Sequence, residues 1–133
     1  MPKQHTYDLK VFVENTDAGG VVYHANYLKF AERARTEYCN SIGIYGRRMM
    51  EDEGIAFVVS SQNVKYVRPA FLEDVLQVRS TIVQVKGASF IVEQDIYRGD
   101  TLIAQIVSKV AIMDMRTGRP VRVGEELAAK FSG

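Results

Sequence analysis

A carboxylate, two adjacent glycines and a histidine stand close together near the start of the chain, and their types could support attack on a carbonyl. Asp17 is followed by Gly19 and Gly20, and His24 comes directly before a stretch with helical periodicity. A carboxylate can act as a base or a nucleophile, while the free N–H groups at a helix start can bind an oxyanion. Adjacent glycines permit close approach of a ligand. On chemistry alone, however, a turn or capping role for Asp17 is the better interpretation.

The residues that follow His24 fit an amphipathic helix, which would hold this segment in place. Apolar residues recur there with a period of 3.6, and charged residues occupy the other face. Asn26 is a suitable N-cap, and Gly43 stands where a glycine would end the helix. We therefore predict a long helix over residues 26–42. Its apolar face consists of Tyr27, Phe30, Ala31, Ala34, Tyr38 and Ile42.

Most of the remaining chain carries strand signals, namely alternating or β-branched runs bounded by turn residues. The predicted strands are residues 7–13, 55–67, 75–85, 89–97 and 102–115, with short helical segments at 47–53 and 125–131. Consecutive strands joined by tight turns imply antiparallel pairing, with the helix covering one face of the sheet. The sequence therefore predicts an α+β fold in a single domain, residues 1–133.

Composition and charge exclude several functional classes. The 133 residues are 47% hydrophobic and 25% charged, as in ordinary soluble domains. A net charge of +1 gives no long-range field, so neither nucleic acid nor membrane insertion is expected. Cys39 is the only cysteine, and no apolar leader precedes the first strand, so we expect a cytoplasmic location. No Cys/His cluster has metal-ligand spacing, so no metal site is predicted.

A specific residue pattern surrounds Asp17. It reads Asn15-Thr16-Asp17, Gly20, Val22-Tyr23-His24, Tyr27, Glu32 and Ala34-Arg35. This pattern resembles the signature of the hotdog-fold acyl-CoA thioesterases, most closely the YbgC type, which are relatives of the 4-hydroxybenzoyl-CoA thioesterases. The resemblance is close over residues 11–43 and looser beyond. It implies a curved antiparallel sheet of about five strands wrapped around one long helix, in agreement with the periodicity.

The resemblance also implies roles for individual residues. Asp17 would be the catalytic carboxylate, and it would either activate water or attack the thioester carbonyl. The backbone N–H at His24 would bind the thioester oxygen, with an optional role for the imidazole. Tyr23 is the aromatic residue best placed to face a ligand. The reaction would convert acyl-CoA and water into a carboxylic acid and free coenzyme A, which is part of the substrate, so no separate cofactor is expected.

Coenzyme A carries phosphates, so its binding calls for cations near the mouth of a cleft. Arg68 follows the long strand that ends at residue 67 and is one candidate. Lys86 and Ser89 correspond to a stretch that often contacts the nucleotide in relatives. The candidate walls of an acyl pocket suit short to medium aliphatic chains at least as well as an aromatic group. They are Phe30, Met49, Met50, Ile55, Phe57 and Val59.

Three further expectations concern contacts. Glu32 is expected either to form an ion pair with Arg35, one helical turn away, or to serve as a structural carboxylate. Cys39 cannot serve as a nucleophile paired with His24, because about 22 Å of helix would separate them. An unpaired sheet edge predicts a homodimer or homotetramer, with Asp17 near the subunit boundary. Alternative functions are a non-catalytic module that binds acyl-CoA or acyl carrier protein, and an aromatic acyl-CoA thioesterase. An association with the Tol-Pal envelope machinery is suggested by family alone.

Overall fold

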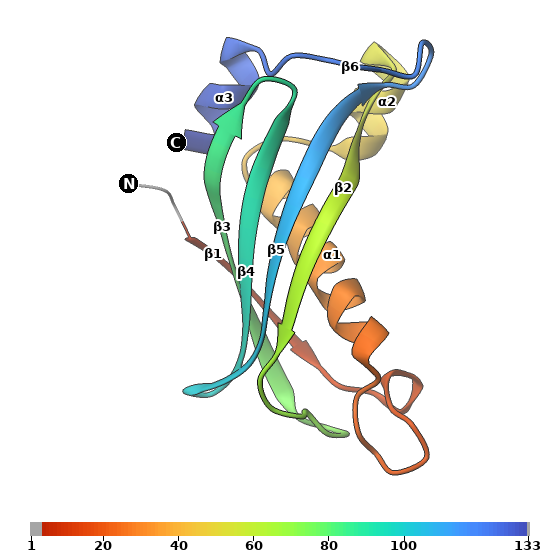
Figure 1. Ribbon diagram of the computed structural model, residues 1–133, viewed down its shortest axis with the longest axis vertical. Helices are drawn as coiled ribbons and strands as arrows, with labels where there is room; N and C mark the ends of the chain where they lie inside the picture. Colours follow the sequence, from red (N-terminus) through yellow and green to blue (C-terminus); the bar gives the residue numbers. More distant parts are fainter. Residues whose placement is uncertain (1–3, 133) are drawn as a thin grey trace.

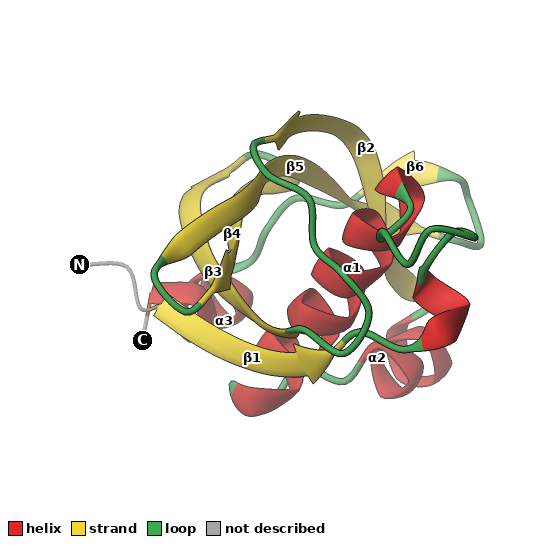
Figure 2. Cartoon of the chain, turned by 90° about the horizontal axis from the view of Figure 1, so that it is seen from below, coloured by secondary structure: helices red, strands yellow, loops and turns green. Residues whose placement is uncertain are grey.

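The computed structural model describes residues 4–132, in which a curled antiparallel sheet wraps around one long helix (Figures 1 and 2). The helices are α1 (His24–Ser41), α2 (Gly46–Glu53) and α3 (Glu125–Ser132), and Val13–Asn15 form a short 3₁₀ turn. The strands are β1 (Gln4–Lys10), β2 (Ile55–Tyr66), β3 (Val75–Lys86), β4 (Ser89–Arg98), β5 (Thr101–Asp114) and the short β6 (Arg119–Pro120). Each predicted element is present, with small shifts at the ends.

The strand order is β1-β3-β4-β5-β2, with β6 paired to β5, and every pair is antiparallel. The predicted antiparallel pairing is therefore confirmed. However, β2 does not lie beside β3, which follows it in the chain, because a long connection containing Pro69 joins them in place of a tight turn. This connection carries the chain across the sheet at the end where α1 begins (Figure 1). It leaves β1 and β2 as the two edges.

The core lies between α1 and the concave face of the sheet. The apolar stripe of α1 is buried as predicted, and Phe30, Ala31 and Ala34 have no exposed surface. They pack in one cluster with Leu76, Val78, Ile96, Ile103 and Ile106. Burying a large apolar side chain such as Phe30 stabilises the fold by about 1.5–3 kcal/mol, so the stripe fixes the helix on the sheet. No helix within residues 4–132 is long and apolar enough to cross a membrane.

The start of α1 differs from the prediction. Tyr23 is the N-cap, and Asn26 lies inside the first turn with 7% of its surface exposed. The Asn26 amide donates from Nδ2 to the carbonyl oxygen of Asn15 (3.1 Å) and accepts from Nδ2 of Asn15 (3.2 Å). The Asn26 side chain therefore pairs with Asn15 and does not cap the helix. At the other end, Gly43 has φ 83°, which confirms the glycine predicted after the helix.

Candidate active site

Asp17 lies in a tight turn that its own side chain organises. Its Oδ1 accepts hydrogen bonds from the backbone N–H of Gly19 (2.8 Å) and of Val21 (3.1 Å). Gly20 has φ 79°, a conformation that favours glycine. Among residues 4–132, no hydrogen-bond donor contacts the second oxygen, Oδ2. The turn therefore uses one carboxylate oxygen for structure and leaves the other accessible, because the residue is exposed.

The turn is tied to the residues that lead into α1. A β-bridge joins Thr16 to Val22, and the Tyr23 N–H donates to the carbonyl oxygen of Asn15 at 3.1 Å. Among residues 4–132, no side chain caps the N-terminus of α1, although the Asn26 N–H donates to the Tyr23 carbonyl oxygen at 2.9 Å. The N–H groups of His24 and Ala25 precede it and have no intrahelical acceptor, so this end is suited to an oxyanion. A carboxylate and an uncapped helix start thus lie in one short, braced segment.

His24, the first residue of α1, packs against β2. Its ring stacks on Tyr66 with centroids 4.2 Å apart, and the Tyr66 hydroxyl donates to the His24 carbonyl oxygen at 3.4 Å. This contact was not predicted, because nothing in the sequence indicates which β2 residue lies opposite the helix start. The stack fixes the orientation of the imidazole and, with it, the first turn of the helix.

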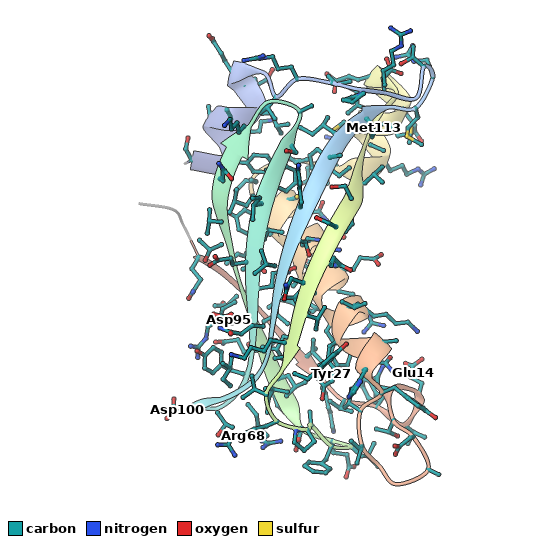
Figure 3. The ribbon with its side chains drawn as sticks, in the orientation of Figure 1. Glu14, Tyr27, Arg68, Asp95, Asp100 and Met113 are labelled. Carbon is teal, nitrogen blue, oxygen red and sulfur yellow. The ribbon has the colours of Figure 1, made fainter. Side chains whose placement is uncertain are left out.

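A cavity of about 220 Å³ opens beside His24 and is shared with Arg68, so the structure brings these two candidate residues together. Its walls also include Tyr27 and Pro69. Figure 3 shows Arg68 and Tyr27 at the same end of the molecule. Tyr23 has 59% of its surface exposed, as expected for a residue that could meet a ligand.

Lys86 and Ser89 lie elsewhere. They flank the turn between β3 and β4, at the end of the sheet opposite the N-terminus of α1 (Figure 1). The Ser89 hydroxyl donates to the Lys86 carbonyl oxygen at 3.4 Å, so it contributes to the turn. Within one chain, then, these two residues do not meet Asp17, His24 or Arg68.

A cavity of about 580 Å³ lies between the C-terminal half of α1 and β2. Three of the predicted acyl-pocket residues, Met49, Phe57 and Val59, line it. The others do not: Phe30 is fully buried in the core, Ile55 faces a different cavity, and Met50 is exposed. A wall made of sulfur, aromatic and β-branched side chains accommodates varied apolar groups.

Glu32 and Arg35 also line this cavity, but the expected ion pair between them is absent from residues 4–132. Instead, Nη1 of Arg35 donates to Oε1 of the fully buried Gln94 at 3.0 Å. Burial lowers the pKa of Arg35, and the charge of Glu32 opposes that effect. The guanidinium points toward the sheet because Oε1 of Gln94 accepts its hydrogen bond there. The spacing of Glu32 and Arg35 along the helix gives no sign of this acceptor.

Besides the predicted separation from His24, the protonation state of Cys39 argues against a nucleophilic role. Burial raises its pKa from 9.0 to about 11, so the thiol is protonated at neutral pH. Among residues 4–132, no cluster of His, Cys, Asp and Glu could hold a metal ion.

Comparisons with known proteins show the family to which the chain belongs. A family model for the thioesterase-like superfamily matches residues 11–131. The acyl-CoA thioesterase YbgC of Haemophilus influenzae is 39% identical over 126 residues, which cover 95% of this chain and 93% of that protein. The crystal structure of a probable thioesterase from Bartonella henselae is 32% identical with a TM-score of 0.86, covering 92% of this chain and 100% of that one.

A second similar structure is that of a 4-hydroxybenzoyl-CoA thioesterase variant in complex with 4-hydroxybenzoyl-CoA. It is 22% identical, with a TM-score of 0.90, and covers 97% of this chain and 99% of that one. Its likeness confirms the hotdog fold predicted from the sequence. The chain belongs to the thioesterase-like superfamily. Within it, the chain belongs to the family of the YbgC acyl-CoA thioesterases.

Proposed function

We propose that this protein hydrolyses acyl-CoA thioesters at the Asp17 turn and the N-terminus of α1. The observation that carries the proposal is the Asp17 carboxylate itself, anchored through Oδ1 with Oδ2 left accessible, in a turn bridged to the start of an uncapped helix. Membership of the YbgC family supports the same reaction. In this proposal Asp17 is the catalytic residue, and the backbone N–H of His24 binds the oxyanion.

Two routes satisfy this arrangement. In the first, Asp17 takes a proton from water, and the resulting hydroxide adds to the thioester carbon. In the second, Oδ2 attacks that carbon to form a mixed anhydride, which water then cleaves. In both, the carbonyl oxygen becomes an oxyanion at the helix start before the carbon–sulfur bond breaks and coenzyme A leaves as a thiolate that takes up a proton. Label that enters Asp17 during a single turnover in ¹⁸O-labelled water would establish the second route, because water that cleaves the anhydride at the Asp17 carbonyl leaves its oxygen there, whereas the first route leaves both carboxylate oxygens unexchanged.

A second subunit is part of the proposal. β2 is an edge strand, and unpaired edges are usually covered in native proteins. Antiparallel pairing of β2 with its copy would extend the sheet and bring the partner's β3–β4 turn to the end that holds Asp17. This arrangement accounts for Lys86 and Ser89 as coenzyme A contacts: they would act on the partner's site, while Arg68 would act on its own.

For the acyl group, we propose short to medium aliphatic chains bound in the 580 Å³ cavity beside β2. This cavity lies beside the C-terminal half of α1, away from Asp17 of the same chain, so in the proposed dimer it would receive the acyl group from the site at the partner subunit's Asp17. Its apolar lining mixes adaptable and aromatic side chains, which suits flexible aliphatic chains better than a rigid aromatic ring. We further propose that the substrate is coenzyme A-linked, with acyl carrier protein as an alternative carrier. A cytoplasmic location remains part of the proposal, supported by the single cysteine.

The test is the release of free thiol from acyl-CoAs of increasing chain length, together with benzoyl and 4-hydroxybenzoyl derivatives. We expect multiple turnovers, with the highest kcat/KM on aliphatic chains. Activity confined to the aromatic substrates would overturn the substrate class and leave the reaction intact. Tight binding of acyl-CoA without turnover on any substrate would favour a binding module.

A further inference from the structure

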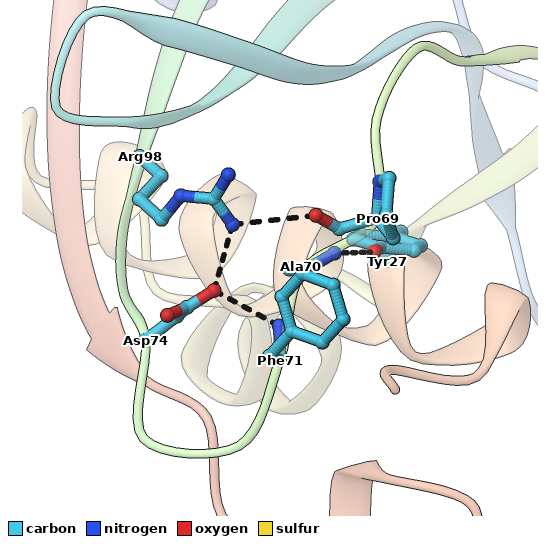
Figure 4. Close-up of polar contacts among 6 residues, drawn as sticks. All are labelled: Tyr27, Pro69, Ala70, Phe71, Asp74 and Arg98. Carbon is cyan, nitrogen blue, oxygen red and sulfur yellow. Dashed lines mark hydrogen bonds and ion pairs between the residues drawn. The ribbon is translucent and has the colours of Figure 1, made fainter. Parts of the chain in front are cut away.

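The connection between β2 and β3 is held by a partly buried ion pair. Nη1 of Arg98, at the end of β4, donates to Oδ2 of Asp74 (2.8 Å) and to the Pro69 carbonyl oxygen (3.3 Å) (Figure 4). The same Oδ2 of Asp74 accepts the Phe71 N–H at 2.9 Å. One guanidinium nitrogen and one carboxylate oxygen therefore fix both ends of the segment from Pro69 to Asp74.

This ion pair differs from the others in residues 4–132. The Arg98 and Asp74 side chains are 35% and 23% exposed, whereas each of the other two pairs has a member at least 89% exposed. Partial burial reduces screening by water and salt, so the pair can hold a fixed geometry that surface pairs do not maintain. A second anchor lies nearby: the Tyr27 hydroxyl accepts the N–H of the buried Ala70 at 3.1 Å (Figure 4).

The segment so fixed carries the Asp17 turn. The Val22 N–H donates to the Ala70 carbonyl oxygen at 2.9 Å, and a β-bridge joins Val21 to Phe71. The Leu72 N–H donates to the Gly20 carbonyl oxygen at 2.9 Å. Val21 in turn supplies one of the two N–H groups that orient the Asp17 carboxylate. A short chain of backbone contacts therefore connects Arg98 to the carboxylate, although Arg98 itself lies on another hairpin.

We propose that Arg98 and Asp74 are positioning residues for Asp17. The inference rests on the proposed function, in which Asp17 is the catalytic carboxylate. Without the ion pair, the Pro69–Asp74 segment would keep its Tyr27 anchor and its backbone hydrogen bonds to Val11 but lose the contact that holds both of its ends. The looser segment would shift the strand-like contacts that set the Val21 N–H and the carboxylate it holds. A displacement of about 1 Å at a reacting group can cost about 100-fold in rate, so a change this far away affects turnover.

The first test is Arg98→Met, which keeps the length of the side chain and removes the charge. We expect kcat to fall roughly 10- to 100-fold, with KM changed by less than about threefold, because the acyl cavity beside β2 is untouched. Arg98→Lys should recover part of kcat, since an ammonium can reach Asp74 but lacks the guanidinium fork. Asp74→Asn, which keeps an acceptor for the Phe71 N–H, serves as the second variant should Arg98→Met not fold.

Arg79→Met is the matched control. Arg79 is also half-buried on the sheet, where it stacks on Tyr97 at 3.9 Å and donates to Gln77 at 2.9 Å, without contacting the Pro69–Asp74 segment. Its loss should leave kcat within about twofold of the parent protein, even if the melting temperature falls as far as in Arg98→Met. Equal losses of kcat in the two variants would mean that Arg98 acts only on general stability, which would overturn the proposal.

A cycle with Asp17→Asn separates this inference from the proposed function. If Arg98 acts through Asp17, Arg98→Met should add less than about twofold to the loss of kcat already caused by Asp17→Asn. The positioning role would be refuted if the two losses of kcat multiplied in full in the double variant. It would also be refuted by a folded Arg98→Met protein with unchanged kcat. Undiminished turnover in Asp17→Asn alone would refute the proposed function instead.

Discussion

At the scale of single residues, the Asp17 side chain combines a structural and a chemical role. Its Oδ1 closes the turn with Gly19 and Val21, as the structural interpretation of an aspartate before two glycines requires. Oδ2 accepts no hydrogen bond from residues 4–132, so the role of Asp17 in the turn is compatible with the proposed chemistry. The structural interpretation and the catalytic one therefore describe the two oxygens of one carboxylate.

Cys39 gives a prediction about pH. Because burial raises its pKa from 9.0 to about 11, alkylation of the folded protein by iodoacetamide should accelerate around pH 11, two units later than for an ordinary thiol. The unfolded thiol ionises first, so Cys39 contributes stability that is fully present below pH 9 and is lost as pH rises toward 11. Cys39→Ala, which cannot be alkylated, is the control, and a midpoint near pH 9 in native buffer would contradict the burial.

At the scale of elements, periodicity was sufficient for α1 and for the five long strands, whereas the two-residue strand β6 was not predicted. The 3.6-residue stripe through Phe30, Ala31 and Ala34 is the buried face, and Gly43 ends the helix as predicted. These features depend on neighbours in the chain. The placement of β2 at the far edge of the sheet depends on a long connection, whose path local residue types do not determine.

In the candidate site, too, the features set by neighbouring residues were predictable and those set by distant residues were not. Asp17 and His24 stand in one contiguous motif, and the structure keeps them in one braced segment. The Tyr66 stack on His24, the Gln94 acceptor for Arg35 and the Arg98–Asp74 pair all join residues from different elements. Such pairings arise from tertiary packing, so a single sequence carries no local signal for them.

The buried amide pair at the start of α1 should be energetically important. Asn26→Ala would leave Nδ2 of the buried Asn15 without its acceptor, which costs about 1–3 kcal/mol, while the Asn15 carbonyl oxygen would keep its hydrogen bond from the Tyr23 N–H. Urea unfolding measures the loss directly. Glu37→Ala, on the exposed face of the same helix, should change stability by less than about 0.5 kcal/mol. Equal effects of the two changes would show that the amide pair contributes nothing.

At the scale of the whole molecule, the proposed second subunit would cover the edge at β2 and bring Lys86 of one copy toward Asp17 of the other. We expect sedimentation at micromolar concentration to give a dimer or tetramer. A mixture of Asp17→Asn and Lys86→Met variants should then regain activity on subunit exchange if sites are shared, because half of the sites in a heterodimer carry neither change. A monomer with full activity would contradict this arrangement.

The central claim is that Asp17 carries out the reaction, and Asp17→Asn tests it most directly. Asparagine keeps the size and the Oδ1 acceptor of the turn, so folding and substrate Kd should change little. Stopped-flow turnover and equilibrium binding are measured on the same preparation. The account predicts a fall in kcat of roughly 10²–10⁴ with a nearly unchanged Kd. A variant that hydrolyses acyl-CoA at close to the parent rate would contradict it.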